Sequence, residues 1–242
     1  MMDQRGSVFQ YYKIALVSVL VLAVSPLILW LKRSPVLHIE LFEKTVLNGY
    51  LNHQLSILPM AFLFIGITFV LADKVRLDYL NLKRRDGVIV PEPYIGIKPQ
   101  PGESWKNLGI NFTIIISLVT ALVIFFQNIY GHTFNIGIVP DLVLVIIFAI
   151  TNSFTEEVIY RLTFVSVVSN ENLGPKLAQA LSAAVFGGVH YFGNPSGIPG
   201  VLMAGFIGWF LAKSMNETRG FFWAWFIHFA QDVIILFAIF AV

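Results

Sequence analysis

Long apolar stretches dominate the chain, and short polar segments separate them. Seven of these stretches approach or exceed the roughly 20 apolar residues that a transmembrane helix needs. They cover residues 12–31, 51–72, 108–130, 141–169, 177–192, 198–213 and 221–242. An eighth helix would be added if residues 36–72 held a further short helix. The pattern therefore predicts an all-α fold, a polytopic transmembrane bundle of 7–8 helices.

The polar segments differ in charge. Residues 131–140 contain no Lys or Arg, whereas residues 73–106 contain Lys74, Arg76, Lys83, Arg84, Arg85, Lys98 and Lys106. Cytoplasmic loops of membrane proteins are enriched in Lys and Arg. We therefore expect residues 73–106 and the N-terminus to lie on the cytoplasmic side. Lys32, Arg33 and Lys44 fall on the opposite side in this orientation.

Composition strengthens the assignment to an integral, multi-pass membrane protein. The 242 residues are 57% hydrophobic and 12% charged, with a mean hydropathy of +0.75, whereas soluble proteins are about 25% charged. The net charge is only +2, so the expected surroundings are the lipid bilayer and no nucleic acid partner is expected. The chain has no cysteine, which excludes disulfides, a cysteine nucleophile and thiolate metal ligands.

Ionisable side chains are concentrated in the last four apolar stretches. A charged residue at the centre of a transmembrane helix costs about 2.5–3.5 kcal/mol, so such residues are rare and usually functional. We identify none in the interiors of the first three stretches; the last four contain Glu156, Glu157, Arg161, His190, His228 and Asp232. We therefore divide the chain into N-terminal helices with a basic loop, residues 1–140, and a catalytic helical core, residues 141–242.

The spacing of Glu156, Glu157 and Arg161 predicts different roles for them. Glu157 and Arg161 are four residues apart with the acid on the N-terminal side, which is the favourable arrangement for an ion pair on a helix. Glu156 is rotated by about 100° from Glu157 around the helix axis, so it faces other surroundings. Glu156 is therefore the candidate base, and the Glu157 and Arg161 pair is predicted to be structural.

Residues from separate helices can complete a polar cavity around Glu156. Phe186 and His190 share one helix face, as do His228 and Asp232, because four residues separate the members of each pair. Such a cavity suits the activation of a water molecule, by carboxylate and histidine alone or through a divalent metal such as zinc. In the second case the metal ligands would be Glu156, His190, His228 and Asp232.

Three short patterns occur in order along the C-terminal part of the chain: Glu156-Glu157-x-x-x-Arg161, Phe186-x-x-x-His190 and His228-x-x-x-Asp232. Together they resemble the CAAX protease and bacteriocin-processing family, CPBP, whose eukaryotic branch includes the type II CAAX prenyl endopeptidases. The likeness covers residues 141–242. It implies an intramembrane protease built from transmembrane helices.

The resemblance also implies a role for the residues of the first two patterns. Glu156 and His190 would activate the hydrolytic water. Glu157 with Arg161 would hold the site together, and Phe186 would pack beside it.

The third pattern departs from the CAAX endopeptidase branch, where Asn is expected at the position of Asp232. The resemblance implies that His228 and residue 232 stabilise the oxyanion. A carboxylate cannot donate a hydrogen bond to an oxyanion unless it is protonated. Orientation of His228, or ligation of a metal, is therefore an alternative role for Asp232.

The predicted function is an endopeptidase, glutamate-dependent or metallo-endopeptidase, that hydrolyses a peptide bond near the membrane surface. Its partner would be a peptide or protein substrate, in the CAAX case a prenylated one. No serine nucleophile is expected, because Ser153 and Ser182 have no clear base at helical spacing. One alternative is a proton- or ion-coupled transporter, because Glu, Asp and His chains also form proton relays. The other is a non-catalytic immunity or scaffold protein with the same fold.

Overall fold

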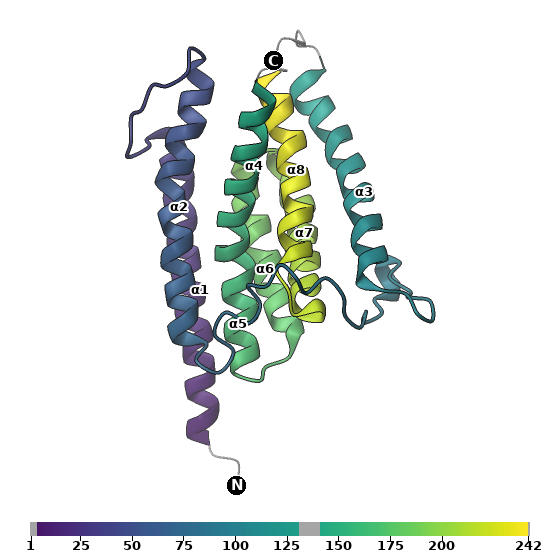
Figure 1. Ribbon diagram of the computed structural model, residues 1–242. Coiled ribbons are helices and arrows are strands. Elements are labelled where there is room, and N and C mark those ends of the chain that lie inside the picture. The colour runs from purple at the N-terminus through teal and green to yellow at the C-terminus, as the bar shows by residue number, and fades with distance from the viewer. Residues whose placement is uncertain (1–3, 131–140, 242) are drawn as a thin grey trace.

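A computed structural model describes residues 4–130 and 141–241. In these ranges the regular elements are helices: α1 Gln4–Arg33, α2 Thr45–Leu71, α3 Trp105–Ile124, α4 Leu142–Glu157, α5 Thr163–Asn170, α6 Pro175–Val189, α7 Gly197–Thr218 and α8 Phe222–Phe240, with short 3-10 or π-helical pieces between or after some of them. A π-helical turn, Val158–Leu162, joins α4 to α5 in one continuous helix. Figure 1 shows the helices running side by side as a bundle, which confirms the predicted all-α fold.

Each predicted apolar stretch corresponds to a helix, with boundaries that shift by a few residues. Within the described ranges, six helices are long and apolar enough to cross a membrane. The exception among the seven predicted spans is α6, which has only 15 residues. The extra helix considered in residues 36–72 is absent, because residues 34–44 are not helical. The predicted cation-free loop, residues 131–140, and Val242 lie outside the described residues.

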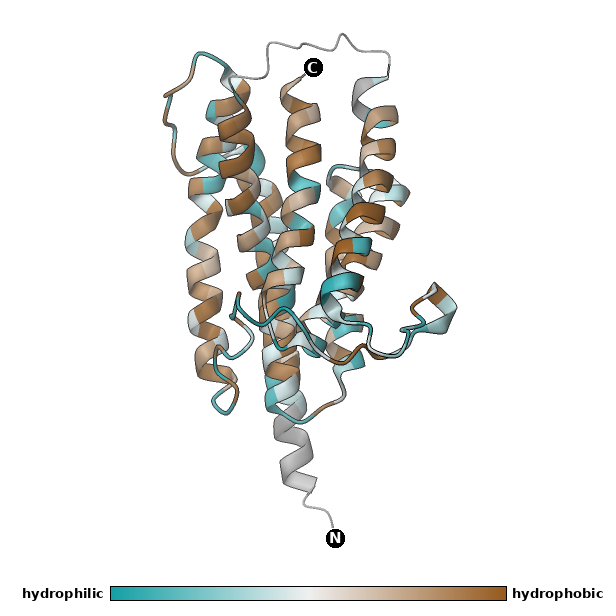
Figure 2. Cartoon of the chain, turned by 45° about the vertical axis from the view of Figure 1, so that its right-hand side comes forward, coloured by the Kyte–Doolittle hydropathy of each residue, from teal (hydrophilic) through white to brown (hydrophobic). Residues whose placement is uncertain are grey.

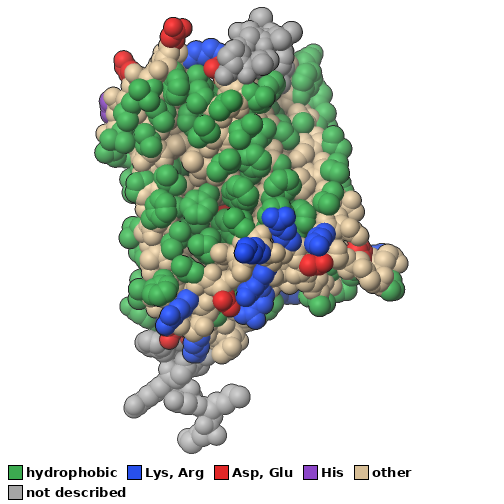
Figure 3. Space-filling view, in the orientation of Figure 1, with side chains coloured by type: hydrophobic (Ala, Val, Ile, Leu, Met, Phe, Trp, Pro, Cys, Tyr) green, Lys and Arg blue, Asp and Glu red, His purple; other side chains and the backbone are tan. Residues whose placement is uncertain are grey.

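With α4 and α5 counted as one helix, successive helices run in opposite directions, so the bundle has two ends (Figure 1). One end, called the basic end below, carries residues 72–104, 171–174 and 219–221. The opposite end carries residues 34–44, where α1 ends and α2 begins, together with the start of α4 and the end of α8. In the view of Figure 3, Lys and Arg side chains gather at the basic end, below a wide apolar surface.

Hydrophobic residues follow the helices along the length of the bundle (Figure 2), and many of their side chains face outward. The outward ones include Phe62 of α2 and Leu118 of α3, both more than half exposed, as expected for surfaces in contact with lipid. Within the bundle, α6 packs most extensively against α7. A Cβ atom at Gly208 would lie 2.7 Å from the carbonyl oxygen of Ser182. Glycine is therefore needed for this close approach of two helices.

The segment between α2 and α3 is fastened to the basic end of α7. Lys213 is buried and donates to the carbonyl oxygen of Val90 (2.6 Å) and to the Glu217 carboxylate. Glu217 also accepts hydrogen bonds from the backbone N–H of Val90 (3.2 Å) and from Trp105 Nε1 (2.9 Å). Gly87 packs against the Glu217 backbone. We refer to Gly87, Val90, Trp105, Lys213 and Glu217 as the clasp.

Adding one methyl group at Gly87 should open the clasp. A Cβ atom there would lie 2.0 Å from the Glu217 carbonyl oxygen, and overpacking of this kind costs about 1–3 kcal/mol. We expect Gly87→Ala to speed trypsin cleavage after the nearby Lys83, Arg84 and Arg85 by about tenfold. Gly174→Ala is the matched control, because no atom lies within 4 Å of its added Cβ. Equal cleavage rates for the two variants would show that the clasp does not hold the segment.

Candidate active site

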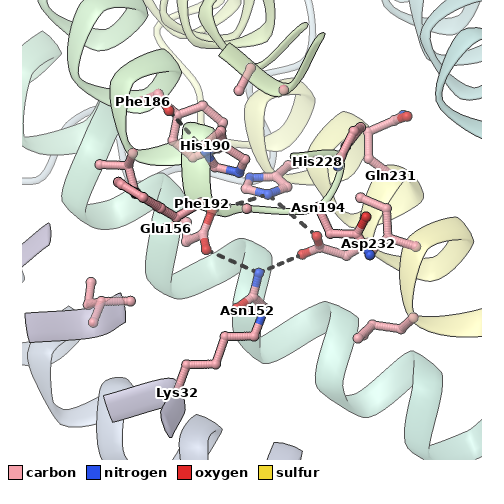
Figure 4. A pocket seen from close by; sticks show the side chains of 18 of the residues that line it. Lys32, Asn152, Glu156, Phe186, His190, Phe192, Asn194, His228, Gln231 and Asp232 are labelled. Carbon is pink, nitrogen blue, oxygen red and sulfur yellow. Dashed lines mark hydrogen bonds and ion pairs between the residues drawn. The ribbon is translucent and has the colours of Figure 1, made fainter. Parts of the chain in front are cut away.

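A cavity of about 140 Å³ lies among the helices at the positions singled out by the sequence. Glu156, His190, His228 and Asp232 all line it, and Figure 4 shows their side chains directed toward one another. Its volume is enough for several water molecules. The structure therefore brings together, around one cavity, the four residues predicted to be catalytic.

The site lies near the middle of the bundle rather than at an end. Glu156 is 14 residues after Leu142 and 14 residues before Asn170, the limits of the continuous α4–α5 helix. At 1.5 Å per residue this is about 21 Å from either limit. Any substrate must therefore enter the bundle to reach Glu156.

The short helix α6 places His190 at the same depth as Glu156. α6 starts at the basic end and stops after 15 residues, and His190 follows immediately in the short 3-10 helix His190–Phe192. If residues 177–192 formed a full span, as the sequence predicted, His190 would lie close to a membrane surface and Glu156 far from one. The two residues instead lie at the same depth, because α6 ends inside the bundle. Non-helical backbone at such depth is tolerated where it lines a cavity, as residues 193–195 do here.

A buried ion pair lies next to the residues of the site. Arg161 Nη1 lies 3.1 Å from Glu157 Oε1, and both side chains are 0% exposed. The same carboxylate oxygen accepts a hydrogen bond from His228 Nδ1 at 2.7 Å. The predicted Glu157–Arg161 pair is thus present, and it extends to α8 through His228. With Nδ1 donating to Glu157, the Nε2 atom of His228 is directed to the other carboxylates.

The π-helical turn that contains Arg161 follows Glu157 directly. π-Helical turns inside α-helices are frequently found at functional sites. Regular α-helical spacing was expected through this region, and the turn was not predicted. The ion pair nevertheless forms across its start, and Glu156 and Glu157 still face different surroundings.

Glu156 and Asp232 share one hydrogen-bond donor. Asn152 Nδ2 donates to Glu156 Oε1 (3.3 Å) and to Asp232 Oδ2 (3.1 Å). The remaining oxygens, Glu156 Oε2 and Asp232 Oδ1, each lie 3.6 Å from His228 Nε2. Glu156 Oε2 has no hydrogen-bond partner within the described part of the protein. It is therefore available to accept a proton from a water molecule in the cavity.

The backbone fixes the orientation of the His190 ring. Its Nδ1 atom is 2.9 Å from the carbonyl oxygen of Phe186, and a carbonyl can only accept, so Nδ1 carries a hydrogen. In the neutral imidazole, Nε2 is then a hydrogen-bond acceptor. His190 can thus hold a water molecule by accepting one of its hydrogens.

Phe186 packs between the groups of the site, beside which the resemblance placed it. Its ring centroid lies 3.6 Å from the guanidinium carbon of Arg161. It is 4.1 Å from the ring of His190 and 5.6 Å from that of His228. One buried aromatic ring therefore separates the buried cation from the two imidazoles and restricts the positions of all three.

Two residues of α2 belong to the surroundings of the site and were missed by the sequence analysis. Gln54 Nε2 donates to Asn152 Oδ1 (3.1 Å), and His53 lines the cavity. The inference that the first three stretches contribute no ionisable interior residue was therefore wrong. His53 is the ninth residue of α2, which begins at Thr45. It was missed because the apolar run was expected to begin at residue 51, which placed His53 at the edge of the run. Asn152 could have been found, because it precedes Glu156 by four residues.

The two serines considered as nucleophiles are engaged elsewhere. Ser153 Oγ donates to the carbonyl oxygen of Ala149 (2.6 Å), and Ser182 Oγ donates to that of Tyr160 (2.9 Å). Neither serine lines the cavity as far as the structure describes it. The geometry agrees with the expectation that serine is not the nucleophile.

The side chains do not form a metal site as they are arranged. Across residues 4–130 and 141–241, no group of three or more His, Cys, Asp or Glu side chains has the geometry to hold a metal ion. The candidate ligands Glu156 and Asp232 instead share the amide of Asn152. The zinc-ligand alternative therefore lacks support from this arrangement.

A protein-family model matches the C-terminal part of the chain. Residues 138–234 match the model described as type II CAAX prenyl endopeptidase Rce1-like. The match confirms the resemblance inferred from the three patterns, all of which lie within it. The matched family is one of endopeptidases, and the match covers 97 of the 242 residues. No curated protein and no solved structure gave a significant match.

Proposed function

We propose that the chain is an intramembrane endopeptidase in which Glu156 and His190 activate the water that hydrolyses a peptide bond. One observation carries the proposal: Glu156 Oε2 is buried and faces the cavity without a hydrogen-bond partner in the described residues. A buried acceptor of this kind normally has a partner. A water molecule between Glu156 and His190 would satisfy it.

The two acceptors can orient and deprotonate that water. One hydrogen would be donated to Glu156 Oε2 and the other to His190 Nε2, which leaves a lone pair directed away from both. Attack of the oxygen on the peptide carbonyl carbon transfers the first proton to Glu156. Glu156 then returns this proton to the amide nitrogen as the C–N bond breaks, which gives a carboxylic acid and an amine.

His228 is suited to stabilise the negative charge on the carbonyl oxygen. Glu157 fixes the ring through Nδ1, so Nε2 in its protonated form can donate to the oxyanion. Asp232 Oδ1 lies 3.6 Å from Nε2, and its other oxygen accepts from Asn152. We assign Asp232 to positioning His228 and Asn152 rather than to direct donation.

The catalytic core would then comprise residues 141–242, with residues 1–140 contributing support. The support includes the hydrogen bond from Gln54 to Asn152 (3.1 Å). Asn152 in turn donates to Glu156. α2 thus positions the proposed base through one intermediate side chain.

Substitution of His190 separates the peptidase from a transporter. We expect membranes with the wild-type protein to accumulate new peptide termini, detected by mass spectrometry, and His190→Gln to reduce their rate of formation by about 10²–10⁴-fold. His38→Gln is the control, because His38 is exposed at the opposite end. If His190→Gln instead abolished ion-driven solute uptake into liposomes and left the termini unchanged, the transporter would be the better account.

A further inference from the structure

The cavity leads from the candidate active site toward the opposite end of the bundle. Its outer part is lined by Lys32 in the last turn of α1, by Tyr50 and His53 in the first turns of α2, and by Ile239 in the last turn of α8. Thr120, in the last third of α3, also lines it. All these helices contribute from the end that lies away from residues 72–104. Figure 4 shows Lys32 beyond Asn152 as seen from His228.

Lys and Arg mark the other end of the molecule. Most of the Lys and Arg residues outside the apolar stretches lie at the basic end: Lys74, Arg76, Lys83, Arg84, Arg85, Lys98, Lys106, Lys176 and Arg219. The N-terminal part of α1 is at the same end, because Lys13 contacts Glu171 (2.9 Å) and Asp73 (3.3 Å). Since the Lys and Arg bias of short loops sets orientation, the basic end is the one that favours the cytoplasm.

The cations that violate this bias have local explanations. Lys44 is paired with Asp141 at 2.5 Å, and the Lys32 side chain lines the outer cavity. Only Arg33 is left as an exception without such a reason. The excess of Lys and Arg at the basic end therefore remains when these three residues are taken into account.

We propose that the cavity opens to the non-cytoplasmic side of the membrane. The proposal rests on the proposed peptidase function and specifies its substrate class: a peptide or membrane-anchored segment presented from the non-cytoplasmic leaflet. As far as the structure describes it, the lining of this cavity includes none of residues 72–104 or 171–174 of the basic end.

Single-cysteine labelling tests the proposal without any need for a substrate. The chain has no cysteine, so Val36→Cys, Tyr94→Cys and Met203→Cys each carry a single thiol. Val36 is exposed at the opposite end, and Tyr94 is exposed in the segment of the basic end. Met203 lines the cavity. The probe is a small, membrane-impermeant thiosulfonate applied to intact cells and to permeabilised cells, with the denatured protein as a control for thiol content.

We expect Val36→Cys and Met203→Cys to react in intact cells, and Tyr94→Cys to react at least tenfold more slowly until the membrane is permeabilised. Reaction of Tyr94→Cys alone in intact cells would overturn the proposal. So would equal reaction of Tyr94→Cys and Val36→Cys, which indicates mixed orientation, or a Met203→Cys thiol that reacts only after permeabilisation or only after denaturation. Because labelling does not depend on cleavage, these outcomes are independent of whether the chain proves to be a peptidase.

Discussion

Glu156→Gln should lower kcat/KM for peptide cleavage by about 10²–10⁴-fold, the usual contribution of a general base. Glutamine keeps the volume and the carbonyl oxygen that can accept from Asn152 Nδ2, an interaction of 3.3 Å in the native protein. It cannot take a proton from water at neutral pH. The fold should therefore survive while the chemistry is lost, and cleavage of a defined peptide by the purified variant measures this.

A matched substitution controls for the loss of a carboxylate as such. Asp141→Asn removes an acid that pairs with Lys44 at the opposite end, away from the cavity lining. We expect its cleavage rate to stay within about twofold of that of the wild type. If Glu156→Gln retained the same rate as Asp141→Asn, Glu156 could not be the base.

Arg161→Met should be the most destabilising of the substitutions considered. It removes the guanidinium that pairs with Glu157, whose side chain is 0% exposed. Removing one partner of a buried ion pair costs about 3–5 kcal/mol, which corresponds to a fall in Tm of roughly 6–20 °C for a chain of this size. Thermal unfolding of the purified variant in detergent gives the value.

The double variant Glu157→Gln with Arg161→Met shows whether the loss comes from the unpaired charge. Glutamine can still accept from His228 Nδ1, a contact of 2.7 Å in the native protein, and methionine fills part of the space of the arginine. We expect the double variant to recover most of the lost Tm. A double variant that is less stable than Arg161→Met alone would argue against a charge-pair origin.

The sequence was sufficient for the fold class because the requirement for apolar length is strict in lipid. Each long apolar run became a helix, since every backbone polar group in the hydrocarbon must be bonded within its own segment. The ends of the helices were harder to predict from the sequence. α6 looked like a span because residues 177–192 are mostly apolar, but close packing on α7 at Gly208 shields a helix that is too short to cross.

The core of the candidate site was also predictable, because an intramembrane Glu, His or Asp has few roles other than function. The catalytic roles assigned to Glu156, His190 and His228 remain predictions. What the sequence could not give was the contribution of Gln54 and His53, which comes from a helix packed against α4 only in three dimensions. Pairwise spacing along one helix carries no information about such contacts. The π-helical turn at Val158–Leu162 was equally hidden.

Isotope labelling of the cleavage products tests the central claim, that these groups direct solvent water at a peptide bond. The wild-type protein and the Glu156→Gln variant would be reconstituted in liposomes and given a pool of apolar peptides in H₂¹⁸O, with products read by mass spectrometry. The account predicts new C-terminal carboxylates that carry solvent ¹⁸O with the wild-type protein and essentially none with the variant. Equal products from both proteins, or an intact pool alongside ion-driven solute uptake by the wild type, would contradict it.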